Sequence, residues 1–260
     1  MNKIIYALLT LAALTSCANS YNIQGSSDVQ MLDGRMLYLK VFKNSDLKNV
    51  DSCDVVHGKF QFTGTVDSTK MATLFMDDES IMPIVIERGE INIKIDNSQQ
   101  MVSGTPLNDK LTAFLEDYNQ LQRQMEDLGH KQSQAIMDGE DENVTNARLN
   151  EEAARIADEE DKLVTGFIEE NFDNVLGPGV FFMLTAANRT PLLTPWIEAL
   201  MSKATDNFKN DAYVKTYYET AKQNEAIMSG MAEPTAAPQA PLPQVPTPNQ
   251  MAQPTDSVQH

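Results

Sequence analysis

The chain of 260 residues is acidic, with 37 Asp and Glu residues against 20 Lys and Arg residues and a formal net charge of -17. Phosphate groups repel such a charge, which argues against nucleic acid and anionic membrane surfaces as partners. The hydrophobic content of 42% and the charged content of 22% are typical of a globular protein, and the length allows one large domain or two small ones.

The first 16 residues have the layout of a secretory signal peptide. Lys3 precedes an apolar run from Ile4 to Leu14, which falls short of the about 20 residues that a membrane-spanning helix needs. A short buried helix is the other alternative. The basic start followed by a short apolar run favours the signal peptide over both.

The segment Leu14-Thr15-Ser16-Cys17 resembles the lipobox of bacterial lipoproteins. The resemblance implies that residues 1–16 are removed and that Cys17 is lipidated, which makes the membrane a partner through the N-terminal lipid. Residues 17–20 then form the lipidated N-terminus and a short linker. In surface-exposed lipoproteins of such bacteria, acidic residues commonly follow the lipidated cysteine, and here none follows Cys17 directly. We therefore expect a lipid-anchored protein of the cell envelope on the outer membrane, facing the periplasm. The cell surface is the alternative.

Residues 21–104 have the pattern of an antiparallel β-sandwich or barrel. Between residues 59 and 64, Phe60 and Phe62 alternate with Lys59 and Gln61, so one face of this strand is apolar. Ile91, Ile93 and Ile95 alternate in the same way. Further strand-like segments and turn-like breaks follow at short spacing: residues 35–43, 71–76 and 84–86, with Asp33-Gly34, His57-Gly58 and Arg88-Gly89 between strands.

Residues 105–230 are predicted to be helical, beginning with Thr105 as the N-cap and Pro106 at the first helical position. Apolar residues then follow at alternating spacings of four and three, which indicates a long helix with coiled-coil character. A second helical stretch follows the acidic break at residues 138–142, and together they predict an antiparallel hairpin. The apolar residues are Leu107, Leu111, Phe114, Tyr118, Leu121, Met125 and Leu128, then Leu149, Ala153, Ile156, Leu163, Phe167 and Ile168.

Shorter helices and a tail complete the chain. Pro178 opens a short apolar helix, Thr194 is the expected N-cap of another, and residues 212–226 form the last. Seven of the 12 prolines lie between Pro234 and Pro254. Residues 231–260 are therefore expected to be a disordered Pro-rich tail.

Four motifs in the strand region resemble an uncharacterised β-rich N-terminal domain family of Bacteroidetes lipoproteins. They are Val50-Asp51-Ser52, residues 58–64 (GKFQFTG), residues 87–91 (ERGEI) and residues 102–109 (VSGTPLND). In that family the domain often precedes a thioredoxin-like thiol–disulfide oxidoreductase domain. Here the Pro-rich tail follows the helices instead. Cys53 is the one cysteine besides Cys17, so no dithiol is present and the redox activity of the relatives is not carried over.

The remaining residues that carry chemistry form no recognisable motif. Cys53 is interpreted as a small buried hydrophobic residue. His57, His130 and His260 have neither metal-ligand nor triad spacing. The acidic runs at residues 77–79 and 138–142 lack the EF-hand pattern and are interpreted as solvated turns. The sequence therefore assigns no catalytic, metal-binding or cofactor-binding residue, and it predicts no cofactor.

These observations favour a non-catalytic binding or scaffold lipoprotein whose partner is an unknown envelope protein. Two alternatives stay open. One is an accessory partner of a separate thioredoxin-like redox protein, by analogy with the fused relatives. The other is a hydrolase with a carboxylate site between the β and helical parts.

Overall fold

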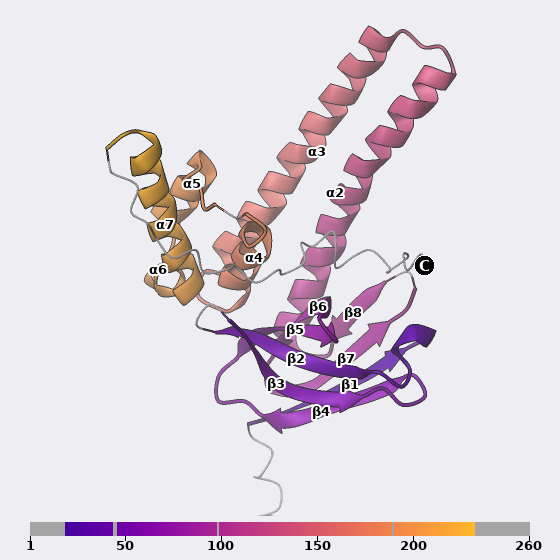
Figure 1. Cartoon of the computed structure of the whole chain (residues 1–260), viewed down its shortest axis with the longest axis vertical. Helices are drawn as coiled ribbons and strands as arrows, with labels where there is room; N and C mark the ends of the chain where they lie inside the picture. Colours follow the sequence, from indigo (N-terminus) through magenta and orange to yellow (C-terminus); the bar gives the residue numbers. More distant parts are fainter. Residues whose placement is uncertain (1–18, 44–45, 98, 189, 232–260) are drawn as a thin grey trace, which may run out of the picture. The chain divides into compact units, whose positions relative to one another are not determined.

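The computed structural model describes residues 19–43, 46–97, 99–188 and 190–231. In these ranges eight strands precede the α-helices, which confirms the predicted α+β class (Figure 1). The chain divides into two compact units. The strand unit extends as far as Lys43 and then over Leu47–Lys110, and the helical unit continues from Leu111.

The strand unit contains two sheets of four strands. The strand order is β4-β1-β7-β8 in one sheet and β3-β2-β5-β6 in the other. The bounds are β1 (Ser20–Ser27), β2 (Met36–Lys43), β3 (Asp46–Asp54), β4 (Lys59–Thr65), β5 (Lys70–Met76), β6 (Glu79–Ile86), β7 (Gly89–Ile95) and β8 (Gln100–Ser103), with a short 3-10 helix, η1, at Gln30–Leu32.

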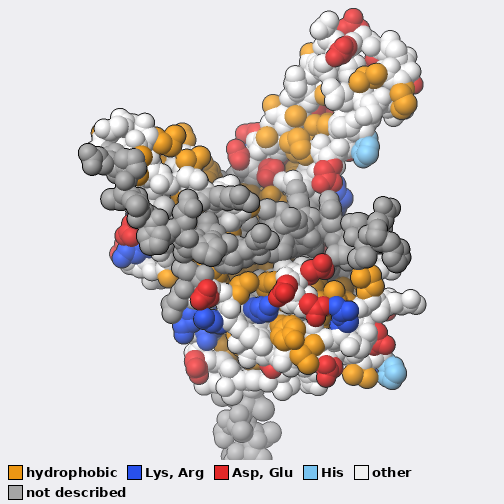
Figure 2. Space-filling view, in the orientation of Figure 1, with side chains coloured by type: hydrophobic (Ala, Val, Ile, Leu, Met, Phe, Trp, Pro, Cys, Tyr) orange, Lys and Arg blue, Asp and Glu red, His pale blue; other side chains and the backbone are white. Residues whose placement is uncertain are grey.

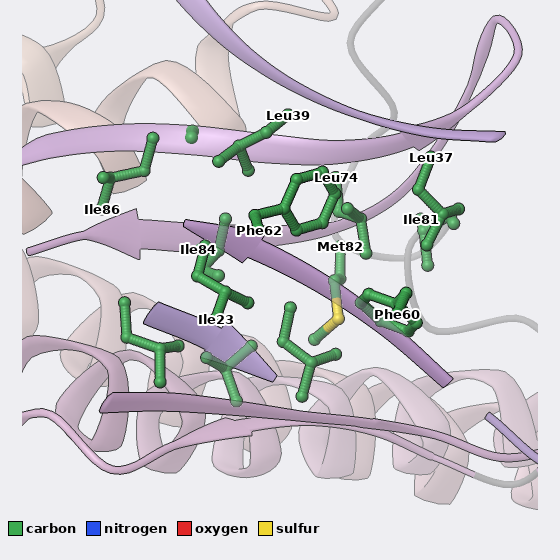
Figure 3. Close-up of a cluster of buried hydrophobic side chains, with 14 of the residues drawn as sticks. Ile23, Leu37, Leu39, Phe60, Phe62, Leu74, Ile81, Met82, Ile84 and Ile86 are labelled. Atoms are coloured by element: carbon green, nitrogen blue, oxygen red, sulfur yellow. The ribbon is translucent and has the colours of Figure 1, made fainter. Parts of the chain in front are cut away.

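One hydrophobic core lies between the two sheets and makes the unit a sandwich (Figure 3). Phe60 and Phe62 are buried with exposed fractions of 5% and 1%, while Lys59 and Gln61 of the same strand are exposed. Ile91, Ile93 and Ile95 are also buried. The inward and outward faces predicted from period-two alternation are therefore correct for β4 and β7.

One strand pair departs from the predicted antiparallel arrangement. β1 pairs antiparallel with β4, but it pairs parallel with β7 on its other side. Alternation shows which face of a strand is buried and carries no information on its direction. Because β1 and β7 are far apart in the sequence, no hairpin turn fixes their relative direction.

Two reciprocal pairs of an aromatic residue and a glycine join β1 to β4. Gly25 faces Phe60 and Gly64 faces Tyr21 in the strand register. A Cβ atom on Gly25 would lie 2.0 Å from the Phe60 ring, and one on Gly64 would lie 2.6 Å from the Tyr21 hydroxyl. Each glycine therefore allows an aromatic ring to lie directly over the backbone of the neighbouring strand.

One side chain from the first turn of the next helix covers part of the outer edge of β6, the last strand of its sheet. Asn108 is fully buried, and its Oδ1 accepts a hydrogen bond from Val85 N at 2.8 Å while its Nδ2 donates to Val85 O at 2.8 Å. The amide thus binds both backbone groups that a further strand would pair. Pro83, two residues earlier on β6, has no N–H to offer an incoming strand.

The same junction changes the expected capping of the first long helix. Thr105 precedes the helix as predicted, and its carbonyl accepts a hydrogen bond from Asp109 N. The Leu107 and Asn108 N–H groups, however, donate to Glu87 Oε1 at 2.9 and 3.3 Å. A carboxylate distant in sequence therefore binds the N–H groups that an N-cap side chain usually binds.

The helical unit begins with two long helices that form the predicted antiparallel hairpin (Figure 1). Their facing sides share a seam of buried aliphatic residues formed by Leu121, Leu128, Leu149 and Ile156. Near the start of the first long helix and the end of the second, Phe114 stacks on Phe167 with ring centroids 4.2 Å apart. The helices are α2 (Pro106–Met137), of which the helical unit holds the part from Leu111, and α3 (Glu142–Glu170).

The later helices pack around Phe181. Its ring contacts those of Trp196, Phe208, Tyr213 and Tyr217. Thr194 caps its helix as predicted, accepting a hydrogen bond from Ile197 N. The helices are α4 (Leu176–Thr185), α5 (Pro195–Lys203), α6 (Asp206–Asn210), which was not predicted, and α7 (Ala212–Met228).

Candidate functional site

Two of the segments singled out in the sequence lie outside the described residues. These are Cys17 with the signal peptide, and the Pro-rich tail from residue 232 onward. Within the described ranges, none of the helices combines the length and the apolar character that crossing a membrane requires.

Cys53 packs against the sandwich core from β3, but it is only partly buried, whereas the sequence predicted a buried residue. Burial raises the pKa of its thiol to about 11, and the nearby carboxylates of Asp51 and Asp54 contribute to the increase, although a hydrogen bond with the Gln61 backbone opposes it. The thiol is therefore protonated at neutral pH, which makes it a weak nucleophile.

The histidines and acidic runs lie on turns and exposed helix positions. His57 and Gly58 form the two-residue turn between β3 and β4, with φ angles of 53° and 68°. His130 is exposed on α2, and His260 lies outside the described residues. Across the described ranges, no three His, Cys, Asp or Glu side chains are grouped so that they could hold a metal ion.

The turn that joins α2 to α3 is held by a set of hydrogen bonds. Gly139, with a φ of 73°, ends α2, and Glu140 N donates to Ala135 O at 3.0 Å. This is the Schellman arrangement of a helix C-terminus. Asp141 then caps α3 by accepting from Asn143 N and Val144 N, while Thr145 Oγ1 donates to Glu140 Oε2 at 2.9 Å. The turn is therefore well ordered.

Three large apolar side chains are exposed around this turn. Ile136, Met137 and Val144 have exposed fractions of 64%, 79% and 68%, whereas the neighbouring Ala135 is buried. Figure 2 shows hydrophobic side chains at this far end of the hairpin. We call these three residues the hairpin tip. Exposed apolar side chains gathered on an ordered turn are typical of a surface that binds another protein.

The hairpin tip lies in a strongly negative part of the chain. Residues 111–170 contain 16 acidic and 5 basic side chains. Several bases are neutralised locally, as in the ion pairs Arg155–Glu159 at 2.7 Å and Lys131–Glu152 at 2.8 Å. The remaining excess of carboxylates gives the tip a negative surrounding, which favours a partner that is positively charged around an apolar contact.

Sequence reasoning identified the turn but missed the apolar tip. The acidic run at residues 138–142 was interpreted as solvated, and the structure places it on the turn. Ile136, Met137 and Val144 did not stand out because they lie outside the seam spacing. Their position beside the turn, away from the predicted buried face, is the signal that could have found them.

The described residues form a two-sheet β-sandwich followed by a helical unit whose first two helices form a long hairpin. The comparison with protein families then identifies the sandwich. Residues 21–111 match the family model described as "Domain of unknown function (DUF4369)". This match bears out the resemblance to an uncharacterised domain family, and it ends one residue beyond the strand unit. The chain matches no curated protein and no solved structure.

Proposed function

We propose that the protein is a lipoprotein of the cell envelope that acts as a non-catalytic binding or scaffold module. The hairpin tip carries the binding part of this proposal, because Ile136, Met137 and Val144 are exposed on a turn that hydrogen bonds hold in place. Binding to a preformed apolar surface costs little conformational entropy. The lipobox-like segment ending at Cys17 supports anchoring by lipid, and an outer-membrane position facing the periplasm is part of the proposal.

The anchor is tested by metabolic labelling with an alkynyl fatty acid. The wild type should be labelled and the Cys17→Ala variant should not. Equal labelling of the two proteins would contradict the lipoprotein proposal. For the membrane side, protease treatment of intact cells should leave the protein uncut, whereas cleavage would indicate the cell surface.

The binding surface is tested by photo-crosslinking in living cells. A photoreactive amino acid at Met137 should give a discrete crosslinked product, and the same group at the exposed Glu151 on α3 serves as the control position. The product should disappear in the Ile136→Ser/Val144→Ser variant and persist in Val56→Ser, which changes an exposed apolar residue of the strand unit. Identical products from both positions, or none from Met137, would contradict a role for the tip.

A further inference from the structure

A groove of about 540 Å³ lies in the helical unit among α5, α6 and α7. Met201 lines it from α5, Lys209 from α6, and Lys215, Tyr218 and Lys222 from α7. The three α7 residues are spaced by three, four and seven positions, which places them on one face of the helix.

The three lysines of the groove have no ion pair with any residue that the structure describes. Lys131, Lys162 and Lys203, in the same unit, each pair with a carboxylate at 2.6–2.8 Å. Glu198 and Glu219 also line the groove, yet they form no ion pair with these lysines. Because two carboxylates accompany three lysines, the lining has a small excess of positive charge, and this excess attracts negative charge locally although the chain as a whole is acidic.

The groove also offers an apolar surface between the charges. The half-buried Tyr218 supplies this surface, and Met201 adds little to it because it is only 6% exposed. Lys222 Nζ lies 4.1 Å from the centroid of the Tyr218 ring, so the ring orients this ammonium group. In the α7 sequence, Lys215 and Lys222 therefore lie on either side of the apolar Tyr218 ring.

The shape and spacing favour a chain segment as the occupant. The groove is open to solvent, whereas sites for small molecules enclose most of the ligand surface. Lys215 and Lys222 are separated by about 10 Å along the α7 axis, which corresponds to about three residues of an extended peptide. We propose that this groove binds an extended acidic peptide segment of a partner protein, with carboxylates at the lysines and an apolar side chain against Met201 and Tyr218. The proposal is independent of the hairpin tip.

The test uses the mature chain from residue 17, with Cys17 replaced by Ser, and a fluorescein-labelled Glu-Ser-Leu-Ser-Glu peptide in an anisotropy titration at low salt. In an extended peptide the Glu, Leu and Glu side chains of this sequence lie on the same face. Wild-type protein should bind, and the affinity should fall with added NaCl because screening weakens contacts between exposed charges. The variant Lys209→Gln/Lys215→Gln/Lys222→Gln should bind at least tenfold more weakly. The matched control Lys43→Gln/Lys59→Gln/Lys70→Gln makes the same change in net charge at exposed positions of the strand unit and should stay within twofold of wild type.

Three results would overturn the proposal. The first is the absence of binding when wild-type protein is titrated to a millimolar concentration. The second is an equal loss of affinity in the groove variant and the control variant, which would indicate an effect of net charge. The third is equal binding of the Gln-Ser-Leu-Ser-Gln peptide, which would show that the carboxylates are not recognised. Circular dichroism of each variant establishes that the helical unit is folded, and the crosslinks from Met137 report on the hairpin tip separately.

Discussion

The sandwich and the α2–α3 hairpin are stabilised in different ways. The sandwich core collects side chains from strands of both sheets, so each strand depends on partners that are distant in the sequence. The hairpin seam joins two helices that follow one another, and Leu121, Leu128, Leu149 and Ile156 form its buried centre. The two regions should therefore differ in cooperativity. Loss of one sandwich residue should affect the whole strand unit, whereas loss of one seam residue should act locally.

Phe62→Ala is expected to have the largest effect. Phe62 is 1% exposed in the sandwich, so its truncation to alanine should reduce the free energy of unfolding of the strand unit by about 3–5 kcal/mol. Urea denaturation measures this free energy. Thr63→Ala, at an exposed position of the same strand, is the control and should cost less than about 0.5 kcal/mol. A loss below about 1 kcal/mol for Phe62→Ala would mean that the assigned core face is wrong.

Asn108→Ala tests whether one side chain completes the edge of the sandwich. Both backbone groups of Val85 would lose their buried partner, so the expected loss is about 2–4 kcal/mol in the same denaturation experiment. Asn108→Leu separates hydrogen bonding from volume, because it fills the space without restoring the bonds. If the leucine variant were as stable as wild type, the hydrogen bonds would not be the stabilising feature.

Leu149→Ala tests whether the hairpin responds locally. The cavity in the seam should cost about 2–3 kcal/mol. Amide hydrogen exchange should become faster in the parts of α2 and α3 nearest the turn that joins them, and it should remain unchanged in the strands. Glu151→Ala, on the exposed side of α3, is the control. Faster exchange throughout the sandwich would contradict the separation of the two regions.

Glu160→Gln should produce the smallest change in stability, and the size of this change should depend on pH. Burial raises the pKa of the Glu160 carboxyl, while the Tyr118 hydroxyl, which donates to it, partly opposes the increase. The folded chain therefore binds this proton more tightly than the unfolded chain. Stability from this group is fully present below the unfolded pKa and is lost as the pH rises through the folded value.

The matching measurement is a series of thermal melts between pH 4 and pH 7. The Glu160→Gln variant should melt above the wild type at pH 7, and the difference should shrink as the pH falls. A variant that melts below the wild type at pH 7 would show that the carboxylate form is the stabilising one.

Some elements of the fold were predictable from the sequence, because their patterns reflect burial directly. The alternation of Phe60 and Phe62 and the seam spacing of α2 each identified a buried face. β3 is exposed along much of its length, so it lacks that alternation. The parallel pairing of β1 with β7 and the capping of α2 by Glu87 depend on residues brought together by the fold, and no local pattern encodes them.

The two proposed binding surfaces were less accessible to sequence reasoning. A lysine in the sequence does not reveal whether a carboxylate will pair with it, and the difference between Lys203 and Lys215 appears only in three dimensions. The same holds for Ile136 and Met137, whose apolar character would suit a buried position equally well. Cys53 was interpretable because the sequence contains no second thiol for it outside the lipobox.

The Asn108 amide has a practical consequence for dividing the chain. A fragment ending at Gly104, the last residue of the predicted β region, would retain every strand but lose the group that occupies the outer edge of β6. Val85 would then present an unpaired N–H and C=O to solvent. A strand from another molecule could pair with these groups and extend the sheet. Such a fragment should associate with itself as its concentration rises, whereas one extended to Lys110 should remain monomeric in analytical ultracentrifugation.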